Sequence, residues 1–559
     1  MRNLKILVLT LGMLAFVFVL SACGGAGAPD PANSTDGGDA AAVDPGTLPI
    51  EERYGGTITT AFGTPPHLDS NRSTMMEVTY ITVNIMQGLM TLDGNMAPVP
   101  ELAESYKISE DGLTYTFKIK QGIKFHNGKE MTMDDVVASF DYWLAVNSNG
   151  AQMAELLADH GAVDADYFFF TTKTPQPTFL GSMGNNQGGM QMVVYPKEIA
   201  DTALTSGQPA EPIGTGPYMV SEYIADQYVK LVPFADYVTG TEEQSGWAGE
   251  IHAYADELVF KFIPEATTRI AGVQTGEIDF GWNLDLSQYD MYSKDPSVKV
   301  FVTTPKTVVY VIPNSAQYPF TDVRARLAAN YAANIEEIAT AAVGNPDFWA
   351  LEPSIFNSGM GDLYVPDCGK GVFNTYDPEK AKALLDEMDY DGTPVVIVQS
   401  KDDNLCLSAM TVYAQQLEAA GFVVDLQIYD KPTVNDIRGG KTGWSMHATD
   451  FGSSYYDVMA FSAWMSTNGW ITNWDDEYSH NMDAIYDKLA VEMDKDKRKE
   501  LIKEWNDYFY VGIPYIKLFN VSSCYILSPE LQDFGYAFPA TDSGFTDIRP
   551  FQWWLYPHK

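Results

Sequence analysis

Hydrophobic and polar residues alternate with a period of two over residues 114–120, which is typical of a strand with one buried face. Tyr115, Phe117 and Ile119 share one side of this strand, and threonines and lysines occupy the other. After Thr132 the apolar spacing changes to that of a helix. The sequence therefore predicts a strand followed by an amphipathic helix, whose apolar faces are buried against each other or against a larger sheet.

The start of this helix carries the usual capping signals. Thr132 is a suitable N-cap residue, and Asp134 and Asp135 lie in the first turn, where negative charge is favourable. An apolar stripe follows, formed by Val136, Val137, Phe140, Trp143 and Leu144. The helix is therefore expected to begin at Thr132 and to pack on a sheet through this stripe.

Strands and helices alternate again in the second half of the chain. Buried strands are predicted at residues 395–399 and 423–428, with an amphipathic helix at 409–420 between them. A strand–helix–strand unit of this kind joins parallel strands. The pattern indicates an α/β protein, and because 559 residues exceed one ordinary core, we expect two or three lobes.

Four motifs occur in an order that resembles the signature of the family 5 extracellular solute-binding proteins, the peptide- and nickel-binding receptors of ABC importers. The longest, at residues 103–144, reads AESYKISEDGLTYTFKIKQGIKFHNGKEMTMDDVVASFDYWL. The others are the loop TPPHLD at 64–69, the turn IGTGPY at 213–218 and the helix start PFTDVR at 319–324. Each piece alone fits any α/β protein, but their order is typical of this family.

The resemblance implies a two-lobed α/β fold of the class II periplasmic-binding-protein type, with an extra inserted domain and a hinge crossed by two chain segments. It also implies a division of the chain. We expect a signal peptide at residues 1–22, a flexible lipoprotein tether at 23–49, lobe I at 50–90 and 212–300, an inserted subdomain of lobe I at 91–211, lobe II at 301–510 and a return to lobe I at 511–559.

The N-terminus combines a short apolar run with a cysteine. Arg2 and Lys5 precede apolar residues 6–20, which fit the core of a signal peptide better than a membrane span. The next residues, LSACG, resemble a bacterial lipobox, which implies lipidation of Cys23. Residues 24–49 are rich in Gly, Ala, Asp and Pro, as in a tether. We expect a lipoprotein at the outer face of the cytoplasmic membrane, or facing the periplasm if the organism has an outer membrane.

Charge and missing motifs exclude several other functions. Asp and Glu number 74 against 35 Lys and Arg, which argues against nucleic acid as a partner. The sequence has no His-Glu-x-x-His, Gly-x-Ser-x-Gly or Cys-x-x-Cys motif. Gly440-Lys441-Thr442 ends like a phosphate-binding loop, but Asn435 stands where that loop needs its first glycine. We therefore expect a protein that is not an enzyme and needs no cofactor or metal.

Residues 444–474 are the densest candidate for a ligand site, because they contain four tryptophans and the isolated acids Asp450 and Asp457. In peptide-binding members of the family, an aspartate of the corresponding segment pairs with the α-ammonium of the peptide. Asp450-Phe451 matches that segment best, and Asp457 is the alternative, although Val458 stands where the family has proline. The expected ligand-binding residues are Asp450, Trp444, Phe451, Asp457, Tyr310, Asn314 and Phe62.

The expected ligand is a short peptide, which a monomeric receptor passes to the permease subunits of an ABC importer. A nickel chelate or an oligosaccharide would keep the fold, and His447 beside Asp450 is a hint of metal. A secreted hydrolase or a surface signalling protein is the alternative from another class. The resemblance also implies a disulfide between Cys368 and Cys406, and three buried thiols, including Cys524, are the other interpretation.

Overall fold

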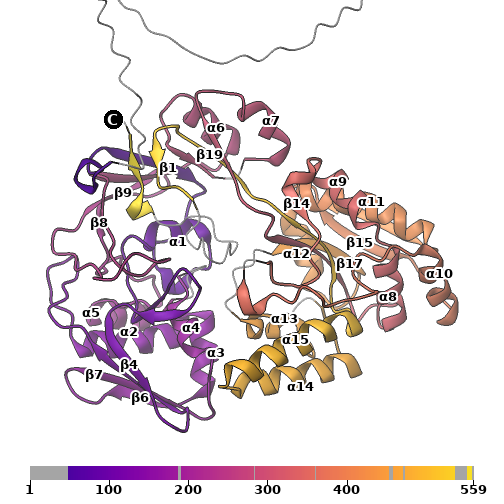
Figure 1. Cartoon of the computed structure of the whole chain (residues 1–559), viewed down its shortest axis with the longest axis horizontal. Coiled ribbons are helices and arrows are strands. Elements are labelled where there is room, and N and C mark those ends of the chain that lie inside the picture. The colour runs from indigo at the N-terminus through magenta and orange to yellow at the C-terminus, as the bar shows by residue number, and fades with distance from the viewer. Residues whose placement is uncertain are drawn as a thin grey trace, which may run out of the picture. The chain divides into compact units, whose positions relative to one another are not determined.

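Two mixed β-sheets form the cores of two lobes (Figure 1). The computed structural model describes residues 48–186, 191–282, 284–358, 360–451, 457–469, 472–535 and 550–556, which belong to one compact unit beginning at Leu48. A four-stranded sheet forms a subdomain inserted into the first lobe. The chain therefore has the two-lobed α/β fold with an inserted domain that the sequence predicts.

The first lobe is built on a seven-stranded sheet with the order β12-β19-β11-β1-β10-β9-β8. β1 is parallel to β10 and β11, and the other pairs are antiparallel. The strands are β1 (Thr57–Phe62), β8 (Tyr218–Ile224), β9 (Tyr228–Pro233), β10 (Glu257–Phe262), β11 (Phe280–Gly281), β12 (Lys299–Val302) and β19 (Cys524–Leu527). The helices are α1 (Met76–Thr82), α5 (Lys197–Ser206), α6 (Ala266–Gln274) and α7 (Tyr289–Tyr292).

The inserted subdomain packs its helices on one face of the sheet β4-β5-β7-β6. The three apolar residues of β5 all lie on the buried face, as predicted, and Tyr115 stacks on Phe170 with 4.7 Å between ring centroids. Thr132 precedes the first helix, and its N–H and hydroxyl both donate to the Asp135 carboxylate, at 2.8 and 2.7 Å. The elements are β4 (Ala103–Ile108), β5 (Thr114–Ile119), β6 (Leu157–Ala162), β7 (Tyr167–Thr172), α2 (Met133–Val146), α3 (Ser148–Leu156) and α4 (Phe179–Gly184).

The second lobe is built on a six-stranded sheet with the order β14-β18-β13-β17-β15-β16. β15 and β16 are parallel, as the strand–helix–strand pattern predicts. The strands are β13 (Thr307–Pro313), β14 (Trp349–Ala350), β15 (Val395–Ser400), β16 (Val424–Tyr429), β17 (Met446–Phe451) and β18 (Ile516–Val521). The helices are α8 (Val323–Ala332), α9 (Ile335–Val343), α10 (Pro378–Glu387), α11 (Asn404–Ala419), α12 (Lys431–Arg438), α13 (Ser462–Met465), α14 (Glu477–Val491) and α15 (Lys495–Gly512).

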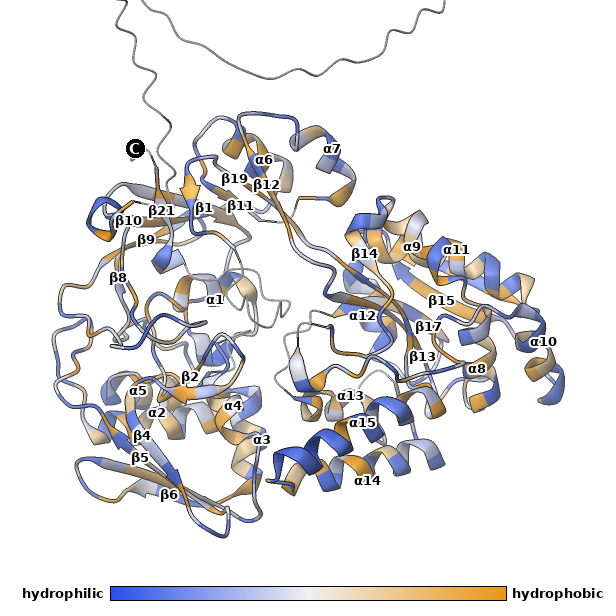
Figure 2. Ribbon diagram, viewed as in Figure 1, coloured by the Kyte–Doolittle hydropathy of each residue, from blue (hydrophilic) through white to orange (hydrophobic). Residues whose placement is uncertain are grey.

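Hydropathy follows this layering. Figure 2 shows β15 mainly in orange, whereas α14 and α15 carry long blue stretches. All six residues of β18 are buried, since β18 lies between β13 and β14 and contacts α8 and α9. A strand buried on both faces shows no alternation in its sequence, which is why period two identifies β5 but not β18.

Two connections join the sheets of the lobes. β12 of the first sheet leads into β13 of the second, and β18 of the second leads into β19 of the first. Thr303 N donates to Ser523 O at 3.0 Å, and Ser523 N donates to Thr303 Oγ1 at 2.8 Å, so the crossings are bonded side by side. The chain leaves the second sheet after Val521 and not at residue 511 as expected, because β18 fills the place between β13 and β14.

Cys368, Cys406 and Cys524 are buried free thiols. The disulfide that the family resemblance implied between Cys368 and Cys406 is therefore a wrong prediction. Each thiol lies in an apolar core, and burial raises the pKa of Cys368 and of Cys524 to about 12. The alternative interpretation of three buried thiols is confirmed.

The expected signal peptide, Cys23 and nearly all of the tether lie in residues 1–47, outside the described residues. Among the helices that the structure describes, none is both long and apolar enough to cross a membrane.

Candidate functional site

β17 lies inside the second sheet, antiparallel to β13 and parallel to β15. Its last residues, Asp450 and Phe451, therefore lie at the edge of the sheet where β15 also ends and α11 begins. Ligand sites of α/β proteins commonly form at this edge. Successive side chains of a strand point to opposite faces, so Asp450 and Phe451 have different neighbours. The site must be described separately on each face.

On one face, Asp450 is exposed to solvent, and within the described part of the chain no cation pairs with its carboxylate and no neighbour donates a hydrogen bond to it. The surrounding protein nevertheless raises its pKa, first by desolvation and second through the charge of Asp403, while Lys431 acts in the opposite direction. Oxygens of Asp403 and Asp450 and the Sγ of Cys406 lie within 4.8 Å of one another. A ligand can therefore reach a carboxylate that lacks a counter-charge.

Asp403 is a site residue that the sequence analysis missed. It is the N-cap of α11, and its Oδ1 accepts a hydrogen bond from Cys406 N at 3.0 Å. Its position shortly after the buried strand β15 could have identified it, because ligand sites often lie at the carboxyl ends of parallel strands. Only the pairing of β15 with β17 shows that this end lies beside Asp450.

Asp457, the alternative anchor, already has partners. Its Oδ2 lies 2.6 Å from Arg498 Nη2, and its Oδ1 accepts from Met459 N at 2.9 Å. The side chains of Asp457 and Arg498 are only 9% and 12% exposed. A ligand ammonium would have to displace a buried guanidinium, so the structure gives Asp457 a structural role.

Three other predicted residues are buried. Trp444 is fully enclosed, and its Nε1 donates to Gly440 O at 2.8 Å. Asn314 is also fully enclosed, and its Nδ2 donates to the carbonyls of Trp444 and Lys441 at 3.0 and 3.1 Å, which holds the segment before β17 in place. Phe62 is 2% exposed in the core of the first lobe. The structure presents none of these side chains to solvent.

On the other face of β17, aromatic rings gather around Phe451. Its half-buried ring stacks on Trp464, with 5.0 Å between centroids and 13° between planes, and it lies nearly parallel to Tyr515 at 6.2 Å. Tyr310 is 5.8 Å from Phe451 but is buried beneath it. The structure therefore brings Phe451 and Tyr310 together, and only Phe451 of the two has an exposed surface. Residues 452–456 of the predicted segment lie outside the described residues.

Arg438, the last residue of α12, lies near this aromatic cluster. Its charge interacts with Tyr515, and desolvation lowers its pKa. Its Nη2 donates to Asn435 at 3.0 Å, but within the described residues no acceptor faces its buried Nε. His447 is also close, and desolvation together with Arg438 lowers the pKa of His447 to about 3. An arginine with an unused N–H is suited to a carboxylate. His447 is enclosed, and its Nδ1 lies 2.8 Å from Val398 O, so its ring is not presented to a ligand.

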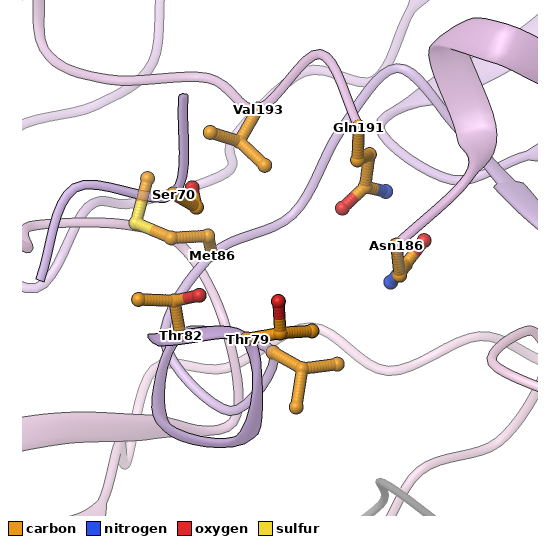
Figure 3. Close-up of a pocket in the computed structure, with 8 residues that line it drawn as sticks. Ser70, Thr79, Thr82, Met86, Asn186, Gln191 and Val193 are labelled. Carbon is orange, nitrogen blue, oxygen red and sulfur yellow. The ribbon is translucent and has the colours of Figure 1, made fainter. Parts of the chain in front are cut away.

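The first lobe contains a small polar cavity between α1 and the segment that leads to Val193 (Figure 3). Thr79 and Thr82 of α1 line it from one side, and Asn186 and Gln191 line it from the other. Its volume of about 10 Å³ is roughly that of one water molecule. The cavity is therefore too small to hold a peptide.

Comparison with known proteins identifies the family. Residues 97–473 match the bacterial extracellular solute-binding proteins, family 5, in the middle region. The chain belongs to this family. Heme-binding protein A of Haemophilus influenzae is 33% identical over 320 residues, which cover 52% of this chain and 54%, about half, of that relative. A probable peptide ABC transporter periplasmic-binding protein of Sinorhizobium fredii is 28% identical over 451 residues, which cover 78% of this chain and 82% of the relative.

Solved structures of family 5 proteins have the same fold. The substrate-binding protein CtaP of Listeria monocytogenes superposes with a TM-score of 0.74 at 22% identity, over 90% of this chain and 99% of that one. DppA of Helicobacter pylori, in complex with the peptide STSA, gives 0.73 at 21% identity over the same shares. NikZ of Campylobacter jejuni, in complex with Ni(L-His), gives 0.71 at 19%, over 89% and 99%. All of these are binding proteins and not enzymes.

Proposed function

We propose that this chain is the lipid-anchored receptor of an ABC importer, which binds peptides between its two lobes and delivers them to the permease subunits. Membership in family 5 supports the receptor role, and the peptide named for one sequence relative and one structural neighbour supports the cargo. The observation that carries the proposal is the accessible Asp450 carboxylate, which has no counter-charge among the described residues. The α-ammonium of a peptide supplies that charge.

The opposite charge of the peptide also has a complement in the second lobe. Arg438 is half-buried, and its Nε has no acceptor in the described chain, so the guanidinium is not fully used by the fold and can pair with a peptide carboxylate. The exposed part of the Phe451 ring offers an apolar surface for a side chain of the peptide. An extended peptide uses its backbone as an added strand, so varied sequences can bind.

Binding needs no chemical change in the solute. Two hydrogen-bonded crossings join the lobes, and a ligand that contacts both lobes shifts the population from open to closed. The monomer is sufficient for this mechanism. Cys23 carries the lipid and residues 24–49 keep the lobes away from the membrane, with the permease in that membrane as the partner.

The first test measures the thermal stability of residues 48–559, which form one compact unit. The ligands are pools of di- to octapeptides with free and with acetylated amino ends, nickel with and without histidine, and oligosaccharides. A ligand at about a hundredfold its dissociation constant adds about 2.7 kcal/mol to the unfolding free energy, which gives a clear shift in Tm. We expect the free-amine peptide pool to raise Tm.

The Asp450→Asn variant locates the anchor. It is expected to lose the response to free-amine peptides, because a buried pair that loses one charge costs about 2 kcal/mol or more of binding energy. Asp425→Asn, an exposed acid of β16 in the same sheet, is the matched control and should respond like the parent. A shift with only nickel or sugar would overturn the cargo, and an unchanged response of Asp450→Asn would overturn the anchor.

A further inference from the structure

The Asp450 carboxylate has a second carboxylate beside it. Asp403 and Asp450 come from different elements, the N-cap of α11 and the end of β17, and their oxygens lie within 4.8 Å of each other and of Cys406 Sγ. Asp403 cannot turn away, because its Oδ1 accepts the backbone N–H of Cys406 at 3.0 Å. The fold therefore holds one carboxylate in place and leaves the other accessible.

Titratable groups of α11 and α12 act on this pair. Asp403 and the Cys406 thiol belong to the start of α11, and Lys431 is the first residue of α12. The backbone N–H of Lys431 donates to Asp402 at 2.9 Å, which holds the start of α12 beside the loop before α11. Among the described residues, no lysine ammonium comes within 4.0 Å of either Asp403 or Asp450. The pair carries like charges with only a distant cation to offset them.

We propose that Asp403 and Asp450 together hold the ammonium of the ligand, and that Asp403 is a specificity-determining residue of this site. The inference rests on the proposed function, which supplies the ammonium. An ammonium has three N–H donors, so it can bond to both carboxylates at once, and it offsets a like-charge repulsion that the more distant Lys431 offsets only in part.

The Cys406 thiol supports the position of Asp403. Desolvation first, and then the charge of Asp403, raise the pKa of this thiol well above its usual range. The protonated thiol can donate to Asp403 and hold that carboxylate in position.

A conservative substitution separates the charge of Asp403 from its capping role. Asparagine is as good an N-cap as aspartate, so Asp403→Asn keeps α11 and removes only the charge. Asp377→Asn is the matched control, because Asp377 caps α10 through Lys380 N at 2.9 Å and has no part in the pair. A merely structural Asp403 would make the two variants behave alike.

The first experiment needs no peptide. Residues 48–559, labelled at the aspartate carboxyl carbons, are titrated with glycinamide, which has a free α-ammonium and no carboxylate. We expect the NMR signals of Asp403 and Asp450 to move with one dissociation constant, and the affinity to fall about tenfold in Asp403→Asn. Movement of the Asp450 signal alone, or of neither signal, overturns the inference. A stronger response to zinc chloride than to glycinamide assigns a metal site instead and also overturns it.

The second experiment uses pH. The ligand ammonium binds the charged form of Asp450, so binding is lost as pH falls through the pKa of that group. The charge of Asp403 helps to raise this pKa, and the Asp403→Asn variant should therefore retain peptide binding to a lower pH although it binds more weakly at neutral pH. Lys431→Met, which removes the opposing cation, should bind more tightly. Identical pH profiles in Asp403→Asn and the parent overturn the inference.

The outcomes distinguish this inference from the proposed function. If Asp450→Asn loses peptide binding and Asp403→Asn does not, the proposed receptor function stands. The proposal that both carboxylates hold the ammonium is then wrong. If no peptide raises Tm but glycinamide still shifts both carboxyl signals, the proposal that both carboxylates hold an ammonium stands. The proposal that the ligand is a peptide is then wrong.

Discussion

Asp450 and Asp457 flank the same short segment of the second lobe, but they differ in burial and in ion pairing. Asp457 is 9% exposed and is paired at 2.6 Å with Arg498, whereas Asp450 is exposed and within the described chain forms no ion pair. A buried charge without a partner would cost several kcal/mol, so the fold must supply the partner of Asp457. Asp450 is partly desolvated but remains accessible, so its partner can come from outside. Pairing within the fold therefore separates structural carboxylates from those available to a ligand.

Glu101 in the first lobe adds a third case. Its Oε2 accepts from Gly88 N at 2.8 Å and from Gln191 Nε2 at 3.0 Å, and its Oε1 accepts from Gln87 Nε2 at 3.4 Å. All three donors are neutral, and desolvation raises the pKa of Glu101 to about 7. A carboxylate with neutral hydrogen-bond donors, on which Lys120 acts only as a weaker charge, keeps its proton to near neutral pH. A full ion pair stabilises the charged form.

The largest effect is expected from breaking the buried pair. Asp457→Ala leaves the Arg498 guanidinium, 12% exposed, without its carboxylate, and should lower the unfolding free energy by about 3 kcal/mol. Urea denaturation measures this loss. Asp507→Ala removes an exposed pair with Lys503, whose side chains are 48% and 51% exposed, and should cost less than about 1 kcal/mol. Equal losses in the two variants would mean that burial does not decide the role of Asp457.

A smaller, pH-dependent effect is expected from Glu101. The pKa of Glu101 is higher in the folded protein than in the unfolded chain, so the unfolded chain loses this proton at a lower pH. The contribution to the unfolding free energy is therefore fully present below about pH 4.5 and is lost as the pH rises to about 7. This loss of unfolding free energy is on the order of 2 kcal/mol. It is smaller than the full pKa shift implies, because part of the Glu101 side chain is in contact with solvent.

Unfolding free energies at several pH values test this dependence. Glu101→Gln should flatten the profile between pH 4.5 and 7, while Glu104→Gln, at an exposed position of β4, should leave it unchanged. A profile of the Glu101→Gln variant that keeps the full slope would assign the titration to another group.

The smallest effect on stability is expected at the proposed anchor. Asp450→Asn removes a charge that the fold does not pair and that Asp403 repels, so the unfolding free energy without ligand should stay within about 0.5 kcal/mol of the parent or rise slightly. Thermal unfolding at pH 7 measures it. A loss as large as that of Asp457→Ala would show that Asp450 has a structural partner.

Local patterns predicted several elements correctly, because each depends on neighbours in sequence. The alternation in β5, the cap at Thr132 and the parallel strands β15 and β16 all appear as expected. The pattern failed at β18, whose apolar residues gave no sign of which sheet they join. The choice of sheet depends on β13 and β14, which are distant in sequence.

The site was harder to predict because aromatic and polar residues serve both cores and surfaces. Trp444 and Asn314 are typical of a binding loop by type, yet both are enclosed and hold that loop together. Asp403 and Arg438 carried no motif, and only the pairing of β15 with β17 and the packing of α12 place them near the end of β17. Whether a charge is paired and how far it is exposed are properties of the folded chain, which the composition does not contain.

The three enclosed thiols allow the stability of the two lobes to be followed separately. Cys524 lies in β19 of the first sheet, and Cys368 and Cys406 lie in the core of the second lobe. A protonated, inaccessible thiol reacts with a disulfide reagent only while its surroundings are open, so each labelling rate reports the frequency of a local opening event. Mass spectrometry after a timed pulse of reagent would thus show which lobe a bound solute makes more rigid.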